Sequence, residues 1–318
     1  MDVVAGLDMG ASKTACVVAD LHARPLSVSL AGSANPNSVG LDGVLLAFNK
    51  ALSEALTPLS SRCPVIRAVC LGVAGLETDR RKSRLETLLR KSLEGPPIVI
   101  ASTDANVALL GALFKRPGAL VIAGTGSVVL GKNSQGQTGR VGGFGFLLGD
   151  EGSGFDIGRK GIQAALRSSD GTGPETLLSQ ALMAFYGIEK PSGVLPLVYQ
   201  NRSKVALVAK FAMEVLSLAF QGDKVSERIV REGVEDLLRA LEALARKLNL
   251  QGAFSFVVTG GLFRNEAFRE LFLESVNRKF PQAKPMQPLY PPEMGAVFMA
   301  LEALGISPFS QEAAPSLG

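Results

Sequence analysis

The chain has 318 residues, of which 47% are hydrophobic, and its formal net charge is +4. This length suits two domains, and the absence of Trp together with only three Tyr argues against a surface that binds single-stranded nucleic acid. The single histidine, His22, excludes a multi-histidine metal site and argues against a Ser-His-Asp triad, and three cysteines without a CxxC spacing indicate reduced thiols.

The first third of the chain alternates between apolar strands and amphipathic helices. Strands are predicted at residues 3–7, 15–20 and 26–31, and a helix is predicted at residues 42–56. Two more buried strands, "IRAVCLGVAG" and "PIVIAS", flank the basic run "RRKSRLETLLRKS", whose leucines recur at helical spacing. We interpret this run as the solvated face of a helix. The segment "STDANVALLGAL" begins with Ser, Thr and Asp and continues with helix formers, which predicts a helix N-terminus.

The pattern then repeats, because "GALVIAGTGSVVLGKNSQGQTGRVGG" echoes the opening "VVAGLDMGASKTACVVADLHARPL". Each half therefore begins with an antiparallel hairpin that has a glycine turn. A later strand, "FSFVVTGG", leads into the helix "FRNEAFRELFLESVNRKF", and a helix over 293–304 closes the chain. We predict an α/β protein of two related domains, 1–112 with 290–318 and 113–289, and a ligand cleft between them.

Three glycine turns at strand ends are candidates for phosphate binding. In "GLDMGASKT", backbone N–H groups near Gly10, the hydroxyls of Ser12 and Thr14 and the charge of Lys13 suit an anion, and Asp8 could hold Mg²⁺ directly or through water. The stretch is not a GxxxxGK[ST] loop, and taken alone it is equally an ordinary hairpin turn.

The other two turns, "AGTGS" and "TGGLFRN", offer backbone N–H groups and hydroxyls in the second half. Taken alone, each is also compatible with a plain strand connection. Together the three turns suit a nucleotide site, in which two turns bind the phosphates and the third binds the nucleoside. The candidates in these two turns are Gly124, Thr125, Gly126, Ser127, Gly260, Gly261 and Asn265.

The ordered set "STDA", "GTGS", "GRVGGFGFLLGDEGSG" and "TGGLFRN" resembles the N-acetylglucosamine kinase group of the sugar kinase, actin and heat-shock chaperone superfamily. That group includes broad-specificity hexokinases, glucosamine and N-acetylmuramate kinases, and ATPase activators of acyl-CoA dehydratases. The resemblance extends from Gly6 to Leu304. It implies two ribonuclease H-like domains, a central cleft, and the use of ATP with Mg²⁺.

The resemblance also implies a sugar site. The "GGFG" stretch would place Gly143, Phe144 and Gly145 beside the sugar, and Asp150 would bind its hydroxyls, for which a carboxylate is suited. Glu151 would contact the sugar or cap the helix that begins near Gly154. The structural alternative for this acidic pair is favourable charge at a helix N-terminus.

The resemblance gives Asp104 the role of the base that accepts the proton of the attacking sugar hydroxyl, as suits a loose phosphoryl-transfer transition state. The alternative is that Asp104 only caps the helix after it. Asn35 matches the sugar-contacting Asn of the family, with Pro36 holding it extended and Asn37 as the local competitor.

Two departures from the family bear on specificity. Many animal N-acetylglucosamine kinases have Trp where this chain has Phe144, which bears on N-acetyl recognition. The dehydratase activators hold an iron–sulfur cluster between subunits with cysteines. Here Cys16 and Cys70 fall in strands and Cys63 precedes a proline, which argues against that role.

We therefore predict an ATP-dependent kinase that phosphorylates the 6-hydroxyl of N-acetylglucosamine or a related sugar. The alternatives are glucosamine, glucose or N-acetylmuramate as acceptor, or an ATPase that activates a partner enzyme. The start of the chain carries Asp2 and no basic leader, and no apolar run is long enough to cross a bilayer. We expect a cytoplasmic homodimer with no nucleic-acid or membrane partner.

Overall fold

The computed structural model describes residues 1–307 except 11–12, 35, 77, 94, 96, 202–203 and 251–252. The chain divides into two compact units. Unit 1 comprises Met1–Lys115 and Pro288–Gly318, and unit 2 comprises Arg116–Gln287. The chain thus leaves unit 1 for unit 2 and returns to unit 1 for its last helix.

Unit 1 contains a five-stranded sheet with the order β3-β2-β1-β4-β5. The strands β1, β2 and β3 form an antiparallel meander, whereas β1, β4 and β5 are parallel. This pattern confirms the predicted opening hairpin. The strand bounds are β1 Asp2–Met9, β2 Thr14–Asp20, β3 Pro25–Ala31, β4 Val65–Val73 and β5 Ile98–Thr103.

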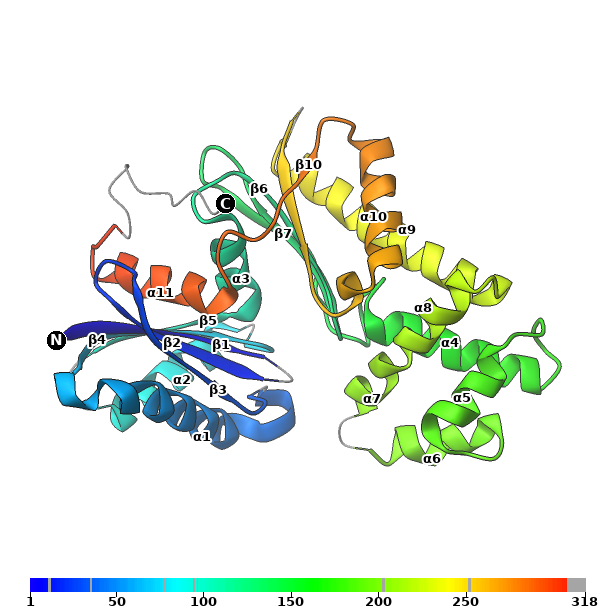
Figure 1. Cartoon of the computed structure of the whole chain (residues 1–318), viewed down its shortest axis with the longest axis horizontal. Helices are drawn as coiled ribbons and strands as arrows, with labels where there is room; N and C mark the ends of the chain where they lie inside the picture. The colour runs from blue at the N-terminus through cyan, green and yellow to red at the C-terminus, as the bar shows by residue number, and fades with distance from the viewer. Residues whose placement is uncertain are drawn as a thin grey trace. The chain divides into compact units, whose positions relative to one another are not determined.

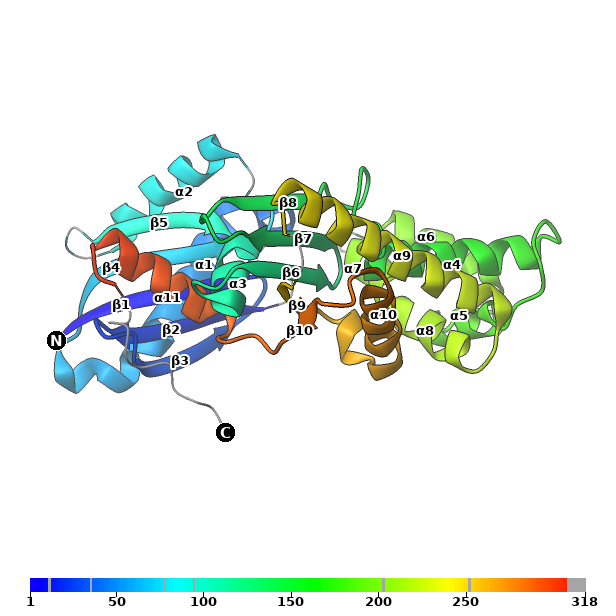
Figure 2. The ribbon, with the colours of Figure 1, turned by 90° about the horizontal axis from the view of Figure 1, so that it is seen from above.

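Helices cover both faces of this sheet, α1 and α2 on one face and α3 and α11 on the other (Figures 1 and 2). Helix α11 lies directly on β1 because Gly6 has no side chain: a Cβ there would lie 2.3 Å from the Glu293 carbonyl oxygen. Gly40 interrupts α1 with a φ of +68°. The bounds are α1 Pro36–Leu56, the 3₁₀ turn η1 Thr57–Arg62, α2 Asp79–Ser92, α3 Asp104–Leu113 and α11 Pro292–Ala303.

Unit 2 repeats the sheet of unit 1, since its order is β8-β7-β6-β9-β10 with the same directions. In both sheets the first strand pairs antiparallel with the second and parallel with the fourth. This repetition confirms the prediction of two ribonuclease H-like α/β domains. The bounds are β6 Gly118–Ala123, β7 Ser127–Lys132, β8 Thr138–Gly142, β9 Ser255–Thr259 and β10 Lys284–Pro285.

The helices of unit 2 share one continuous core with its sheet. Helix α9 packs on β7 and β8, and α10 packs on α9 (Figure 1). The helix predicted to begin near Gly154 is α4, whereas the helices from α5 to α9 were not predicted. The bounds are α4 Gly154–Ser169, α5 Leu178–Tyr186, η2 Pro191–Gly193, α6 Val194–Tyr199, α7 Lys204–Lys210, α8 Ala212–Phe220, α9 Lys224–Lys247, η3 Leu262–Arg264 and α10 Glu266–Lys279.

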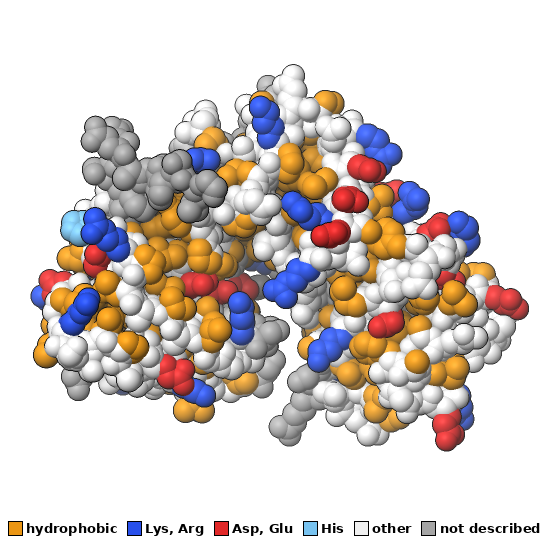
Figure 3. All heavy atoms as spheres, viewed as in Figure 1, with side chains coloured by type: hydrophobic (Ala, Val, Ile, Leu, Met, Phe, Trp, Pro, Cys, Tyr) orange, Lys and Arg blue, Asp and Glu red, His pale blue; other side chains and the backbone are white. Residues whose placement is uncertain are grey.

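Charged side chains on α9 and α10 alternate in sign, and Figure 3 shows basic and acidic groups interspersed over these helices. The ion pairs here include Arg228 with Glu232 at 3.9 Å and Lys279 with Glu242 at 3.2 Å. The net positive charge is therefore not gathered on these two helices. Within the described ranges, no single helix is long and apolar enough for a bilayer, and Lys204–Phe220 and Lys224–Lys247 meet that test only as a pair bent by 116°.

Candidate functional site

The glycine turns of unit 2 lie against one another. A Cβ at Gly260, whose φ is +109°, would lie 2.3 Å from the Ala123 carbonyl oxygen, and a Cβ at Gly124 would lie 3.7 Å from the Gly261 backbone nitrogen. Only glycine fits at position 260, because a side chain would collide with the end of β6. The strand ends of β6 and β9 therefore present bare backbone, which suits a ligand that approaches closely.

The predicted phosphate turn is also joined to the predicted sugar loop. The Ser127 hydroxyl donates to the Glu151 carbonyl oxygen at 2.8 Å, and the Phe155 amide donates to the Thr125 carbonyl oxygen at 3.1 Å. The Asp150 carboxylate packs on Gly126, where a Cβ would lie 2.6 Å from its Oδ2 atom. Two motifs more than twenty residues apart thus form one surface of unit 2.

The backbone conformation explains why residues 142 to 152 are rich in glycine. Gly142, Gly143 and Gly145 have φ values of +74°, +72° and +83°, and Gly152 has +72°. Side chains other than those of Asn and Asp rarely adopt this region, and the one other residue of the loop that adopts it is Asp150, at +61°. The loop is therefore a tightly turned segment whose shape depends on its glycines.

Two charged side chains hold the ends of this loop. At the first end, the Arg140 guanidinium donates to the Gly142 carbonyl oxygen at 3.1 Å and to that of Gly143. At the second end, the buried Asp156 carboxylate accepts from the Gly152 amide at 3.1 Å. The tip between them is exposed, with Phe144 69% accessible. These contacts fix the backbone on both sides of the predicted sugar contacts.

Asp156 is in turn surrounded by cations. Its carboxylate lies 2.8 Å from Arg159 and 2.9 Å from Lys160, and Lys160 lies 3.6 Å from Asp236 of α9. Burial alone would raise the pKa of Asp156, but hydrogen bonds from Lys160, Gly152 and Arg159 together lower it below its usual value. We did not predict this role, because an Asp in the first turn of a helix is also typical of favourable charge at a helix N-terminus.

Several predicted side-chain roles need correction. The cap of α4 is Ser153, whose hydroxyl accepts from the Asp156 amide at 3.2 Å, so Glu151 is not the cap. The side-chain oxygen Oδ1 of Asn265 caps α10 by accepting from the Phe268 amide at 3.0 Å. The Ser127 hydroxyl donates its hydrogen bond within unit 2, so we remove it from the phosphate contacts. The side-chain nitrogen of Asn265 stays a predicted contact.

Unit 1 carries the remaining predicted residues. Asp8 lies near the end of β1, and the hairpin closes with the Gly10 amide donating to the Lys13 carbonyl oxygen at 2.9 Å. Lys13 is exposed, whereas Thr14 is fully buried and donates its hydroxyl to the Gly32 carbonyl oxygen at 2.8 Å. We therefore also remove the Thr14 hydroxyl from the phosphate contacts. Ser12 lies outside the described residues.

Asp104 begins α3 directly after β5, but it is not the cap of that helix. The cap is Thr103, whose hydroxyl accepts from the Asn106 amide at 3.2 Å, while Asp104 Oδ1 accepts from the Ala105 amide at 2.9 Å. Strands β1 and β5 flank β4 in parallel, so Asp8 and Asp104 lie at the same edge of the sheet. Asn35 and the side chain of Asn37 lie outside the described residues.

The Asp8 carboxyl has a pKa raised to about 7, first by burial and then by the negative charges of Asp104 and Glu293, while Lys13 lowers it. No three Asp, Glu, His or Cys side chains among the described residues form a metal cluster. Mg²⁺ commonly needs only one or two carboxylates, with phosphates and water completing its shell. The negative charges of Asp8, Asp104 and Glu293 fit such an ion.

Glu293 is the acidic neighbour that our sequence analysis missed. It lies in the first turn of α11, and its charge raises the pKa of Asp8. The available signal was the segment "PPEMG", in which prolines precede an acidic residue at a helix start. That signal indicates a helix N-terminus, and only the packing of α11 on β1 places it beside the site.

Comparisons with known proteins cover both units. The profile of the BadF/BadG/BcrA/BcrD ATPase family matches residues 5–300. The chain is 32% identical to an N-acetylmuramic acid/N-acetylglucosamine kinase of Clostridium acetobutylicum, over 94% of this chain and 98% of the relative. It is 29% identical to an N-acetyl-D-glucosamine kinase of Dictyostelium discoideum, over 95% and 98%. A solved structure from Chromobacterium violaceum, assigned as an N-acetylglucosamine kinase, superposes with a TM-score of 0.75 at 25% identity, over 94% and 98%.

Proposed function

The chain belongs to the BadF/BadG/BcrA/BcrD ATPase family, and within this family we propose that it is an ATP-dependent kinase of amino sugars. The reaction transfers the γ-phosphoryl group to the 6-hydroxyl of N-acetylglucosamine or a close relative. The observation that carries this proposal is the similarity to an N-acetylmuramic acid/N-acetylglucosamine kinase along nearly the whole of both chains. It is supported by the glycine turns that lie together in unit 2 and by the carboxylates at one sheet edge of unit 1.

Asp104 is the proposed base. Its carboxylate accepts the proton of the attacking hydroxyl, and this transfer can come late because the phosphoryl-transfer transition state is loose. A weak base therefore suffices, and positioning supplies most of the acceleration. The start of α3 at Asp104, with its cap supplied by Thr103, leaves the Asp104 carboxylate free of the capping role.

The proposed nucleotide contacts are the turns of unit 2 and the hairpin of unit 1. Backbone N–H groups at Gly124, Gly126, Gly260 and Gly261 suit phosphate and nucleoside, as does the Thr125 hydroxyl. From unit 1, Gly10 and Lys13 serve the phosphates, and Ser12 stays a prediction. Asp8 would hold Mg²⁺, directly or through water, and the ion would neutralise charge on the phosphates.

The proposed sugar contacts lie on the loop held by Arg140 and Asp156. Gly143 and Gly145 bring backbone close to the ligand, and Phe144 adds an exposed apolar face. Asp150 and Glu151 offer oxygens to sugar hydroxyls. Asn35 stays a predicted contact from unit 1.

A coupled assay of ADP release over a panel of sugars tests the proposal. The panel contains N-acetylglucosamine, glucosamine, glucose and N-acetylmuramate, and ³¹P NMR identifies the phosphorylated position. ADP formed only with sugar, and a product phosphorylated at the 6-position, support the kinase. ADP formed at the same rate without sugar indicates an ATPase instead.

The second candidate function, an ATPase that activates a partner enzyme through a cluster held by cysteines, is disfavoured by the thiols. Cys16 and Cys70 are buried in the sheet of unit 1, and Cys63 is exposed. Buried thiols of this kind cannot reach a cluster shared with a second subunit. Iron and sulfide analysis of protein purified without oxygen tests this alternative.

We also propose that the kinase works in the cytoplasm as a homodimer. Three free cysteines suit a reducing compartment. Exposed apolar side chains such as Leu147, Tyr199 and Phe220 offer area for self-association. Sedimentation velocity across a range of concentrations tests the dimer, and a single monomeric species would contradict it.

A further inference from the structure

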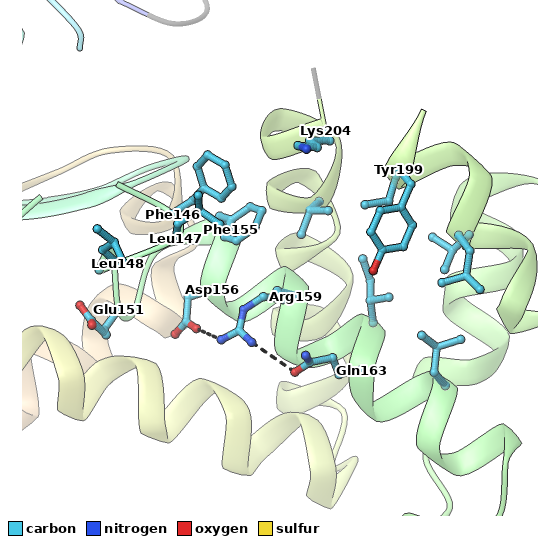
Figure 4. A pocket seen from close by; sticks show the side chains of 17 residues that line it. Phe146, Leu147, Leu148, Glu151, Phe155, Asp156, Arg159, Gln163, Tyr199 and Lys204 are labelled. Atoms are coloured by element: carbon cyan, nitrogen blue, oxygen red, sulfur yellow. Dashed lines mark hydrogen bonds and ion pairs between the residues drawn. The ribbon is translucent and has the colours of Figure 1, made fainter. Parts of the chain in front are cut away.

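A large cavity lies beside the predicted sugar loop in unit 2. Its volume is about 720 Å³, and it lies between the loop residues 146–151 and the helices α4, α6 and α7 (Figure 4). Glu151 lines the cavity and also belongs to the predicted sugar contacts. The cavity thus adjoins the loop that we propose as the sugar site.

The walls of this cavity are mostly apolar. Phe146 and Phe155 meet edge to face with ring centroids 5.1 Å apart, and Figure 4 shows Tyr199 on the opposite side. Buried aliphatic side chains line the same space. The apolar wall includes Phe146, Phe155, Ile162, Leu166, Val198 and Val208.

Three of the polar groups that line the cavity, Asp156, Arg159 and Gln163, are paired with one another, and Glu151 lies exposed at its border. Arg159 binds Asp156 at 2.8 Å and Gln163 at 3.4 Å, as the dashed lines in Figure 4 mark. Lys160 compensates the remaining charge of Asp156 at 2.9 Å. Because these groups need no further partner, the cavity favours an uncharged apolar ligand over an ion. Lys204 is exposed where it borders the cavity.

We propose that this cavity is a subsite for an apolar substituent carried by the sugar, larger than an acetyl group, such as a longer acyl chain or an aryl or alkyl aglycone. The inference rests on the proposed function, because it needs the sugar at the adjoining loop. The volume lies within the range of sites for drug-sized ligands, far above what a two-carbon arm fills. Each further buried methylene should strengthen binding about threefold to fourfold.

Kinetics with substituted sugars test the subsite. Glucosamine carrying N-acetyl, N-butyryl, N-hexanoyl and N-benzoyl groups, and N-acetylglucosamine carrying butyl, hexyl and phenyl groups at C1, are compared by kcat/KM for ADP release. In one of the two series, kcat/KM should rise with substituent size, by about tenfold or more at six carbons. If kcat/KM falls with size in both series, the subsite is wrong.

Variants that fill the cavity test whether the gain in kcat/KM depends on it. Val198→Trp and Leu195→Trp should abolish the gain from the larger substituent and leave kcat/KM for N-acetylglucosamine near the wild-type value. Leu197→Trp is the matched control, because Leu197 is a 38% exposed residue of the same helix that does not line the cavity. A gain that survives both filling variants would overturn the assignment to this cavity.

A binding measurement separates this inference from the kinase proposal. Fluorescence anisotropy of 4-methylumbelliferyl N-acetylglucosaminide, without ATP, reports occupancy whether or not phosphate is transferred. Tighter binding than that of N-acetylglucosamine by competition, lost in Val198→Trp and kept in Leu197→Trp, supports the subsite even if no sugar stimulates ADP release. Equal affinity of the probe for wild type and both variants, together with no gain in the N-acyl series, contradicts the subsite.

Discussion

Two partly or fully buried aspartates, one in each unit, have opposite electrostatic environments. Asp8 of unit 1 lies near Asp104 and Glu293, and burial with these charges raises its pKa to about 7. Asp156 of unit 2 is bound by Arg159, Lys160 and the Gly152 amide, which lower its pKa despite burial. Negative neighbours thus outweigh the single opposing charge of Lys13 at Asp8, whereas cations bind the carboxylate of Asp156 directly.

This contrast indicates different roles: the Asp8 carboxylate is suited to bind a ligand, and the Asp156 carboxylate stabilises the fold. A buried acid without a partner destabilises the free protein and marks a functional site. A buried acid with several partners holds structure in place, and Asp156 holds the backbone at the end of the sugar loop. The Asp8 carboxylate therefore suits a cationic ligand, whereas the sugar loop of unit 2 is held in shape by contacts within the protein.

The largest expected effect is that of Asp104→Asn in unit 1. An amide cannot accept the proton of the sugar hydroxyl, so kcat should fall by roughly 10²–10⁴-fold, with the KM for ATP little changed. Because Thr103 supplies the helix cap, the thermal midpoint should stay near wild type. Steady-state kinetics with the best sugar and a thermal melt provide the two readings. Normal turnover would remove Asp104 from the mechanism and leave Asp150 as the next candidate.

The second-largest effect should be a loss of stability when Asp156 of unit 2 is replaced. Asp156→Ala leaves Arg159 and Lys160 without their shared partner and should lower the free energy of unfolding by about 3 kcal/mol. The lowered pKa of Asp156 means that its contribution is present above the unfolded value near 4 and is lost as the pH falls below it. Urea unfolding at pH 7 and pH 3.5 should therefore show a gap that shrinks in acid.

Asp236→Ala serves as the control for this variant. Asp236 contacts the same Lys160 at 3.6 Å but does not touch the sugar loop. Only Asp156→Ala should also raise the KM for sugar. Equal effects of both variants on the sugar KM would show that Asp156 does not position the loop.

A third pair of variants compares two hydroxyls of one turn. Thr125→Val should raise the KM for ATP about tenfold or more and leave stability unchanged, because one hydrogen bond to a charged group contributes about 1.5–3 kcal/mol. Ser127→Ala should instead lower the free energy of unfolding by about 1 kcal/mol, because its hydroxyl binds the Glu151 carbonyl oxygen. Initial rates over a range of ATP concentrations and urea unfolding distinguish them. The reverse assignment of effects would mean that Thr125 is structural.

The smallest expected effect is a gain of stability in Asp8→Asn. The folded pKa of about 7 lies above the unfolded value of 3.8, so the wild-type carboxyl loses stability as the pH rises from about 4 through 7. Without nucleotide or Mg²⁺ at pH 8, the variant should be more stable than wild type, and the gap should shrink as the pH falls toward 4. Calorimetry at both pH values gives the answer, and a variant less stable at pH 8 contradicts it.

Local patterns predicted the parts of this fold that depend on neighbouring residues. The two hairpins, the strand "FSFVVTGG" and the helix beginning near Gly154 follow from apolar periodicity and glycine turns, and the structure confirms them. The helices from Leu178 to Lys247 were not predicted. The helices as far as Phe220 carry no motif and pack mainly against α4, whereas Lys224–Lys247 has apolar residues at helical spacing that were overlooked. The partners of Asp156 lie within four residues of it, so their spacing was visible in the sequence, but only the structure shows that this carboxylate is buried and binds the Gly152 amide.

For the site, too, local sequence patterns were predicted and contacts made by packing were not. The glycine turns were found because their spacing is a property of the sequence, and the family resemblance assigned their roles. The hydroxyls of Thr14 and Ser127 were assigned to phosphate because the sequence cannot show that a nearby carbonyl oxygen accepts them. Glu293 was missed because it reaches Asp8 only through the packing of a helix from the other end of the chain.

The return of α11 to unit 1 has a consequence for synthesis on the ribosome. At 5–20 residues per second, roughly ten to thirty seconds separate the emergence of Lys115 from that of Pro292. During that interval the sheet face that carries Val4 and Cys70 lacks its covering helix, while unit 2, which is continuous, is complete first. Nascent chains stalled before Pro292 should therefore leave Cys70 open to a thiol reagent or a chaperone, and chains extended past Ala303 should protect it. Equal reactivity at both lengths would show that the N-terminal segment closes without its last helix.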